Sequence, residues 1–193
     1  TNPFIHLYEN PLLPSENWED YDVVGISIIG ISQIIPGLTL ARMVKEKYPH
    51  LHLTLGGPIF SVNAGQLIGH PEFFDDFCHS IVTFEGEEPM HRLLSALKAG
   101  DSLKTVPNLL HLDGREVMQN KERVELRFEE LPNPVFDGLP MDKYLSPYPI
   151  IPVLQSRGCY WGKCTFCTHS FVYGHRYGKQ KTMAMVDELE SLM

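Results

Sequence analysis

Short apolar runs and longer amphipathic stripes alternate along the first hundred residues. Val23–Ile29 is an almost continuous, β-branched apolar run, which is typical of a strand buried on both faces. Leu51–Leu55 and Ser80–Phe84 repeat the pattern and predict two further strands. A fourth, shorter run at Phe4–Tyr8 predicts a short strand near the start of the chain.

Helical spacing of apolar residues fills the intervals between these strands. The pattern predicts helices from about Pro36 to Lys47 and from Glu88 to Lys98, and a short helical segment around Val62–Ile68. Alternating strands and helices of this kind predict an α/β, flavodoxin-like (Rossmann-like) parallel sheet with helices on both sides, over residues 1–100.

The pattern changes after residue 100. We interpret residues 101–148 as a connector, in which Asp113-Gly114 lies between two strand-like runs and predicts a β-hairpin. Glu129–Pro134 indicates an extended strap.

The last segment, residues 149–193, combines one predicted strand, a loop and one predicted helix. The strand is expected over Ile150–Gln155 and the helix over Met183–Met193, with Thr182 as its N-cap. Apolar residues along one side of this helix are expected to pack into a core: Met185, Val186, Leu189 and Leu192.

Composition narrows the function classes. The chain has 193 residues, a net charge of −8 and no block rich in Lys or Arg, so a nucleic-acid partner is not expected. We expect no membrane span, because no apolar run reaches the roughly 18–20 residues that one needs, and no signal peptide at Thr1–Phe4. Three of the four cysteines lie close together, which favours a metal site in a reducing, cytoplasmic compartment over a disulfide framework. Cys78 stands apart and is expected to be a structural thiol.

The clustered cysteines carry the most specific chemistry. Cys159, Cys164 and Cys167 have the spacing C-x4-C-x2-C in a loop with Gly158 and Gly162. Three thiolates can hold a 4Fe–4S cluster that leaves one iron open for a small molecule. A structural zinc site is the alternative, and it would take His169 as its fourth ligand.

This loop resembles the cluster loop of the radical S-adenosylmethionine (SAM) enzymes. The usual family spacing is C-x3-C-x2-C with an aromatic residue before the third cysteine, a position that Phe166 fills. The first gap is one residue longer here, as in some cobalamin-dependent members. The resemblance implies that Cys159, Cys164 and Cys167 each bind one iron, and that the fourth iron binds SAM and cleaves it reductively to a 5′-deoxyadenosyl radical.

The ends of the predicted strands are rich in glycine, and ligands of doubly wound sheets bind beyond such carboxyl ends. Glycine at these ends also suits plain strand-to-helix turns, and the residues alone leave both readings open. The candidate contacts are Ser27, Gly30, Gly56, Gly57, Glu85 and Gly86.

These strand ends resemble the cobalamin-binding domain that precedes many radical SAM domains. Ser27 would match the serine of its SxL element, with Ile29 in place of leucine, and Gly56-Gly57 would match its double glycine. No D-x-H-x-x-G motif is present, so the sequence predicts no histidine ligand to cobalt. A phosphate-accepting aspartate and a P-loop lysine are also missing where response regulators and P-loop proteins need them.

Together the resemblances imply a radical SAM enzyme with a 4Fe–4S cluster, SAM and cobalamin as cofactors. They imply methyl transfer to an unactivated carbon of a small molecule or peptide, with an external electron donor. A barrel needs roughly 200 residues, so residues 149–193 would be the first strand–loop–helix unit of a truncated partial barrel, and the chain an inactive fragment. The alternative function is a non-catalytic cobalamin- or partner-binding module with structural zinc.

Overall fold

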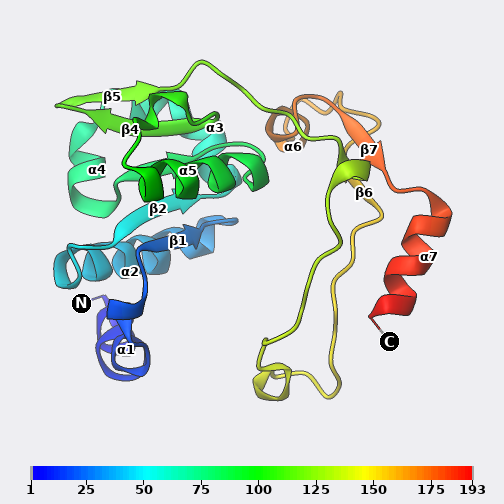
Figure 1. The fold of residues 1–193 in the computed structure, drawn as a ribbon, viewed down its shortest axis with the longest axis horizontal. Helices are drawn as coiled ribbons and strands as arrows, with labels where there is room; N and C mark the ends of the chain where they lie inside the picture. The colour runs from blue at the N-terminus through cyan, green and yellow to red at the C-terminus, as the bar shows by residue number, and fades with distance from the viewer. Residues whose placement is uncertain (1, 193) are drawn as a thin grey trace. The chain divides into compact units, whose positions relative to one another are not determined.

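A computed structural model describes residues 2–192, which fold as two compact units. The first unit is Thr1–Val124 and the second is Glu125–Met193 (Figure 1). The expected connector is therefore divided: its hairpin belongs to the first unit and its strap to the second.

A five-stranded sheet with the order β1-β2-β3-β4-β5 lies at the centre of the first unit. Its strands are β1 Val23–Ser27, β2 His52–Gly56, β3 Ser80–Val82, β4 Leu109–Asp113 and β5 Glu116–Gln119. The first three run parallel, and β4 and β5 pair antiparallel. The α/β class, the three parallel strands and the Asp113-Gly114 hairpin are confirmed. The hairpin joins the same sheet, which makes the sheet mixed.

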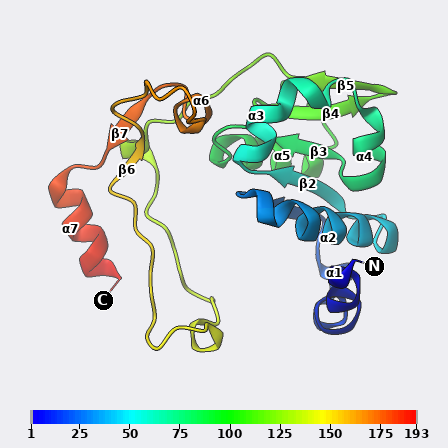
Figure 2. The ribbon, with the colours of Figure 1, turned by 180° about the vertical axis from the view of Figure 1, so that it is seen from behind.

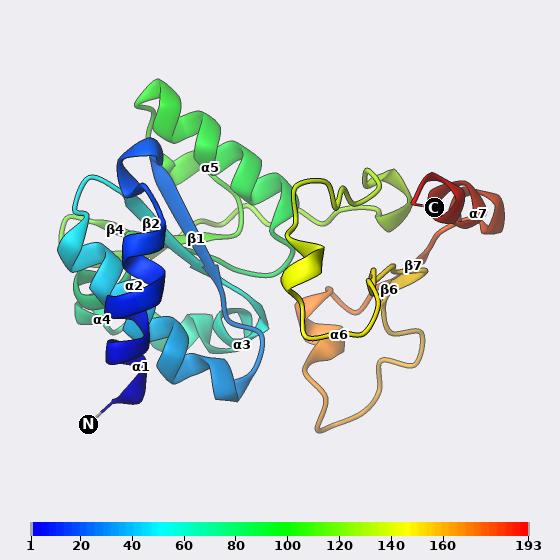
Figure 3. The ribbon, with the colours of Figure 1, turned by 90° about the horizontal axis from the view of Figure 1, so that it is seen from below.

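Helices cover both faces of this sheet, as predicted. They are α1 Pro3–Leu7, α2 Ile34–Lys47, α3 Pro58–Leu67, α4 Pro71–Phe77 and α5 Glu87–Ala99. Figures 1 and 2, which view the unit from opposite sides, show α5 over one face and α2, α3 and α4 over the other, and Figure 3 agrees. A π-helical turn and four 3-10 turns connect these elements: Tyr8–Leu12, Leu13–Ser15, Trp18–Asp20, Ile31–Gln33 and Leu103–Thr105.

Alternation along the strands divides the core between the two faces. Ile81 and Leu110 pack with buried residues of α2, α3 and α4, whereas their neighbours Val82 and Leu109 pack with Leu93 of α5. Successive side chains of a strand point to opposite faces, so the same two strands supply both clusters. The α5 side of β1 stays open, because Gly25 and Ser27 are exposed.

Two expectations for the first unit are wrong, and one helix was missed. Val23–Ile29 was expected to be buried on both faces, but β1 is an edge strand in which Gly25 and Ser27 are exposed. Phe4–Tyr8 is helical rather than extended, because Asn2 caps the first turn by accepting from the Phe4 N–H and Pro3 suits that turn. Helix α4 was not predicted, although Pro71 at its first position is a start signal.

The second unit contains a small antiparallel sheet and two helices. Strand β6, Ser156–Gly158, pairs with β7, Tyr177–Lys179. The helices are α6 His169–Val172 and α7 Thr182–Ser191, and 3-10 turns lie at Phe128–Glu130 and Met141–Lys143. The strand expected over Ile150–Gln155 does not form. The strand β6 begins only at Ser156, where the chain pairs with β7.

Helix α7 forms where expected, with two corrections. Thr182 is its first residue and Lys181 its N-cap. The predicted packing stripe is not buried: Val186 is 38% and Leu189 42% exposed, whereas Glu188 is buried and its carboxylate accepts from Gln180 Nε2 at 3.0 Å. An amphipathic helix buries its apolar face only against a matching surface, and residues 2–192 provide none for this stripe. Over the same residues, no helix has the length and apolar character needed to cross a membrane.

Candidate functional site

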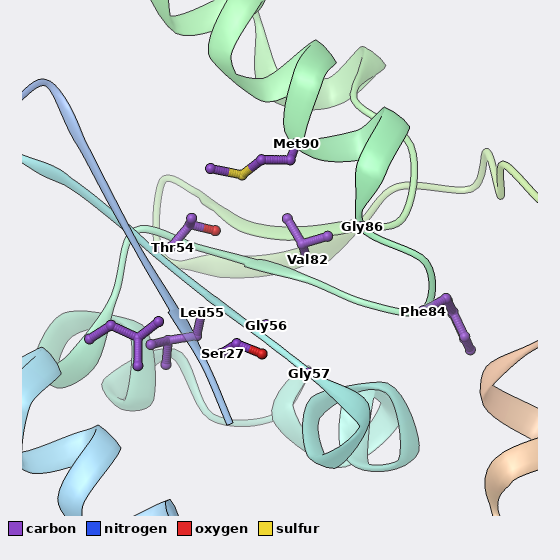
Figure 4. A pocket seen from close by; sticks show the side chains of 11 residues that line it. Ser27, Thr54, Leu55, Gly56, Gly57, Val82, Phe84, Gly86 and Met90 are labelled. Carbon is purple, nitrogen blue, oxygen red and sulfur yellow. The ribbon is translucent and has the colours of Figure 1, made fainter. Parts of the chain in front are cut away.

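A cavity of about 340 Å³ opens at the carboxyl ends of β1, β2 and β3, on the face covered by α5 (Figure 4). Four of the predicted contacts line it: Ser27, Gly56, Gly57 and Gly86. Gly30 and Glu85 do not. The Gly30 N–H donates to Gln33 Oε1 at 3.2 Å at the start of a 3-10 turn, and Glu85 is only 7% exposed.

Five further residues that were not among the predicted contacts also line the cavity. They are Gly25, Thr54, Val82, Phe84 and Met90, and Ile26 and Leu55 complete the wall. Gly25 carried a usable signal, since glycine inside an apolar strand indicates a close approach to the backbone. Met90 gave none, because a helical methionine is ordinarily core packing.

Because Gly25, Gly56 and Gly57 have no side chains, backbone atoms form the floor of this cavity. Gly57 has φ +111°, and a Cβ there would overlap the backbone of Ile28, so only glycine allows the turn from β2 into α3. A Cβ on Gly25 would be 3.7 Å from Thr54 Cγ2 and 3.9 Å from Met90 Cε, which is ordinary contact within the cavity. The cavity therefore exists partly because residue 25 has no side chain.

Uncharged residues line the cavity. The lining residues that the structure describes include no ionisable side chain, and Ser27 and Thr54 supply the hydroxyl groups. Thr54 is 3% exposed, and its Oγ1 accepts from Ser80 Oγ at 3.0 Å. Such a site offers surface and hydrogen bonds but no general acid or base, so it can bind a ligand rather than transform one.

A polar chain continues behind the floor of the cavity. His52 Nε2 lies 2.9 Å from Ser80 Oγ, and the His52 and His79 rings are tilted by 33° with centroids 5.2 Å apart. Burial, and then the neighbouring His79 and Lys45, lower the pKa of His52 to about 4. Both imidazoles are neutral at pH 7, because burial also lowers the pKa of His79.

The cysteine loop lies in the second unit, between β6 and α6. Gly158 has φ +84°, and a Cβ there would overlap the carbonyl oxygen of Arg176, so glycine is needed where β6 leads into the loop. The Cys159 N–H donates to that carbonyl at 3.3 Å, and the Cys167 N–H donates to the carbonyl of Cys164 at 3.3 Å.

All three thiols of this loop are free, and those of Cys164 and Cys167 are exposed. Three accessible thiols on one short loop are the donor type that an iron–sulfur cluster requires. They do not converge: among residues 2–192, no three Cys, His, Asp or Glu side chains lie close enough together to hold a metal ion. His169, the predicted fourth zinc ligand, instead lies against Tyr173 with ring centroids 4.8 Å apart.

Cys78 is a separate, structural thiol, as predicted. It is completely buried in the first unit, and burial raises the pKa of its thiol to about 12. A thiol with so high a pKa stays protonated and takes no part in ligation at neutral pH.

The class of fold is Rossmann-like α/β, and the comparisons with known proteins agree with it. No family model matches the chain. An uncharacterized methyltransferase of Pyrococcus horikoshii, PH0819, is 29% identical over 175 residues, which are 90% of this chain. The chain spans 37% of the length of that relative.

Two solved enzymes share the fold. The cobalamin-dependent S-adenosylmethionine radical enzyme OxsB, with aqua-cobalamin and S-adenosylmethionine bound, matches 98% of this chain with a TM-score of 0.70 and 22% identity. The radical S-adenosylmethionine methyltransferase TsrM of Kitasatospora setae, with cobalamin and a 4Fe–4S cluster bound, matches 94% with a TM-score of 0.60 and 20% identity. The chain covers 25% of the OxsB chain and 38% of the TsrM chain.

Proposed function

We propose that this chain binds cobalamin in the cavity at the ends of β1, β2 and β3, as part of a cobalamin-dependent radical SAM methyltransferase. The observation that carries the proposal is the convergence of Ser27, Gly56, Gly57 and Gly86, predicted from separate strand ends, on one glycine-floored cavity. OxsB and TsrM, which share the fold, are cobalamin-containing structures, and PH0819 is named a methyltransferase.

The cavity fits part of such a cofactor. Its volume of about 340 Å³ is near the lower end of the roughly 300–1,000 Å³ of small-molecule sites. The Ser27 and Thr54 hydroxyls could hydrogen-bond a polar substituent, while the bare backbone of Gly56 and Gly57 lets a flat or extended group approach closely. A site without ionisable lining residues leaves the reactivity to the bound cofactor, which would supply the transferable methyl group.

We assign the 4Fe–4S cluster to Cys159, Cys164 and Cys167, and the cluster would supply the electron that cleaves SAM. The support is the donor type and accessibility of the three thiols together with the family resemblance of the loop. Two features of the chain hold the start of this loop: Gly158, and the hydrogen bond from the Cys159 N–H to the carbonyl of Arg176. They fix the first of the three thiols against β7. The substrate would be a small molecule or a peptide, and an external donor would supply electrons.

A filled-cavity variant tests the cobalamin site. Gly25→Leu adds a side chain at a position that lines the cavity, and its Cβ meets only the side chains of Thr54 and Met90 at ordinary contact distances, so the fold is expected to survive. Hydroxocobalamin should co-elute with the unsubstituted chain and not with Gly25→Leu. Gly65→Leu is the matched control, because a Cβ at Gly65 in α3 meets open space. Equal binding by Gly25→Leu, or no binding by the unsubstituted chain, contradicts the proposal.

Metal analysis after anaerobic purification tests the cysteine loop. The proposal predicts about four irons and sulfides per chain, a brown colour, and loss of both in Cys159→Ala, Cys164→Ala and Cys167→Ala. Cys78→Ala should keep the iron, since that thiol is buried in the first unit. Stoichiometric zinc without iron would support a structural zinc module instead.

A further inference from the structure

Phe84, at the rim of the cavity, has a backbone conformation that an aromatic residue rarely adopts. Its φ is +61°, and among residues 2–192 only two other non-glycine residues, Asn108 and His175, have positive φ. A bulky residue in the left-handed region is strained, and such strain persists only where the surroundings enforce it. Strained residues of this kind concentrate at ligand sites.

Core packing does not account for this strain. Phe84 belongs to neither apolar cluster of the first unit that the structure describes, and it is only half-buried. It does line the cavity, and Figure 4 shows it at the rim, where the chain leaves β3 toward Gly86, with its side chain directed away from Met90 and Thr54.

Ser61 and Arg123 both contact Phe84. Its N–H donates to Ser61 Oγ at 2.7 Å, and Ser61 is 2% exposed in α3. The guanidinium carbon of Arg123 lies 3.8 Å from the centroid of the Phe84 ring, which is close for a cation–π contact. The first contact fixes the backbone and the second fixes the ring.

The buried side-chain amide of Asn108 links the segment that contains Phe84 to the segment that contains Arg123. Asn108 is 3% exposed; its Nδ2 donates to the carbonyl of Glu85 at 3.3 Å and to that of Val124 at 3.1 Å. Its Oδ1 accepts from the Val124 N–H at 3.2 Å. Glu85 and Val124 directly follow Phe84 and Arg123, so the Asn108 side chain keeps the guanidinium next to the ring.

We propose that Phe84 contacts the ligand of this cavity, and that Arg123 is a positioning residue that acts through the Phe84 ring. The inference rests on the proposed cobalamin site and adds to it the residue at its rim. The other lining residues are glycine, hydroxyl-bearing, aliphatic or methionine, so the Phe84 ring, held on one side by a guanidinium, adds the aromatic contact for the apolar surface of a large, flat cofactor.

Titration with hydroxocobalamin tests this assignment. Phe84→Ala should weaken binding roughly three- to tenfold, the amount that an aromatic contact contributes, whereas Phe84→Tyr keeps the ring and should bind like the unsubstituted chain. Arg123→Ala should weaken binding roughly two- to fivefold, and Arg115→Ala, a charge change in the hairpin turn, should have no effect.

A double-substitution cycle separates positioning from direct contact. If Arg123 acts through the ring, Arg123→Ala should have no further effect on affinity in the Phe84→Ala background. An equal loss in both backgrounds overturns the positioning role, and unchanged affinity of Phe84→Ala overturns the ligand contact. If the unsubstituted chain binds no hydroxocobalamin, the proposed function itself fails.

The strain has a readout that needs no ligand. In the left-handed region glycine is favoured over alanine, so Phe84→Gly should melt at a higher temperature than Phe84→Ala, the reverse of the usual order. A higher melting temperature for Phe84→Ala would contradict the conformation on which the inference depends.

Discussion

Gly57 is the residue on which the junction between β2 and α3 depends. It leads from the floor of the cavity into the helix with φ +111°, and the end of β1 lies against it: the Ile28 N–H donates to the Gly56 carbonyl at 2.8 Å. A side chain at residue 57 would therefore change the shape of the cavity and also push against the chain at the end of β1.

Gly57→Ala should therefore destabilise the first unit by about 2 kcal/mol or more, since it combines a strained φ with overlap against the Ile28 backbone. Chemical denaturation measures the effect. Gly65→Ala is the matched control, because α3 has open space at Gly65 and alanine favours a helix by up to about 1 kcal/mol. Equal stabilities of the two variants would contradict the close approach at Gly57.

The sequence identified some site residues and missed others for identifiable reasons. Ser27, Gly56, Gly57 and Gly86 were predicted because parallel strands bring their carboxyl ends to one edge. Phe84 was missed because its positive φ depends on Ser61 and Asn108, which are 23 and 24 residues away. No local pattern encodes a conformation that distant hydrogen bonds enforce.

Helix α4 is held at its carboxyl end by one side chain from α2. The Lys45 ammonium donates to the carbonyls of Phe74, Asp75 and Cys78, the latter two at 2.9 and 3.0 Å. A cation at this end of a helix satisfies carbonyls that lack helical partners and opposes the helix dipole.

Lys45→Met keeps most of the aliphatic stem and removes the ammonium, so it should destabilise the first unit by about 1–2 kcal/mol. Lys98→Met, at an exposed position of α5, is the control and should change the free energy of unfolding little. A Lys45→Met variant as stable as the control would show that water replaces the ammonium at no cost.

His52, the first residue of β2, makes the stability of the first unit depend on pH. The pKa of His52 is lowered from 6.5 to about 4 by burial and then by His79 and Lys45. The unfolded state therefore binds more protons than the folded state between these values, so stability is fully present above pH 6.5 and falls as the pH drops toward 4.

Thermal melting between pH 7 and pH 4 measures this loss. His52→Gln keeps a group that can hydrogen-bond Ser80 and removes one titrating site, so its melting temperature should fall less over that interval. A pH profile identical to that of the unsubstituted chain would contradict the assignment to His52.

At the scale of elements, apolar runs of similar length formed different structures, depending on their flanking residues and on the neighbours available to them. Val23–Ser27 and His52–Gly56 formed strands that pair with each other in the parallel part of the sheet, and Leu53 and Leu55 are buried in the core. Phe4–Tyr8 is as long as the run Leu51–Leu55 but was misassigned, because the Asn2 cap and Pro3 favour a helical turn there. In the second unit, Ile150–Gln155 stayed irregular because a strand needs a neighbour, which its own residues do not specify.

At the scale of the whole molecule, the two candidate sites fall in different units. The cavity belongs to Thr1–Val124 and the cysteine loop to Glu125–Met193. A substitution in one site therefore leaves the core of the unit that holds the other site unchanged. We expect Gly25→Leu to abolish cobalamin binding and keep the iron content, and Cys164→Ala to do the reverse; iron and cobalt analysis of both variants checks this.

Another cavity of the first unit can be compared with the one at the strand ends as a location for the ligand. It has a volume of about 550 Å³ and lies between α1 and α2, where Ile5, Leu38 and Arg42 are among its lining residues. It is larger than the cavity at the strand ends, so volume alone would favour it for a cofactor.

Hydrogen exchange with and without hydroxocobalamin tests the central claim most directly. The account predicts slower exchange at residues 25–28, 54–58 and 82–86, at the ends of β1, β2 and β3, and unchanged exchange in α1 and along α2. Protection confined to α1 and α2, or binding without protection at the three strand ends, would contradict it.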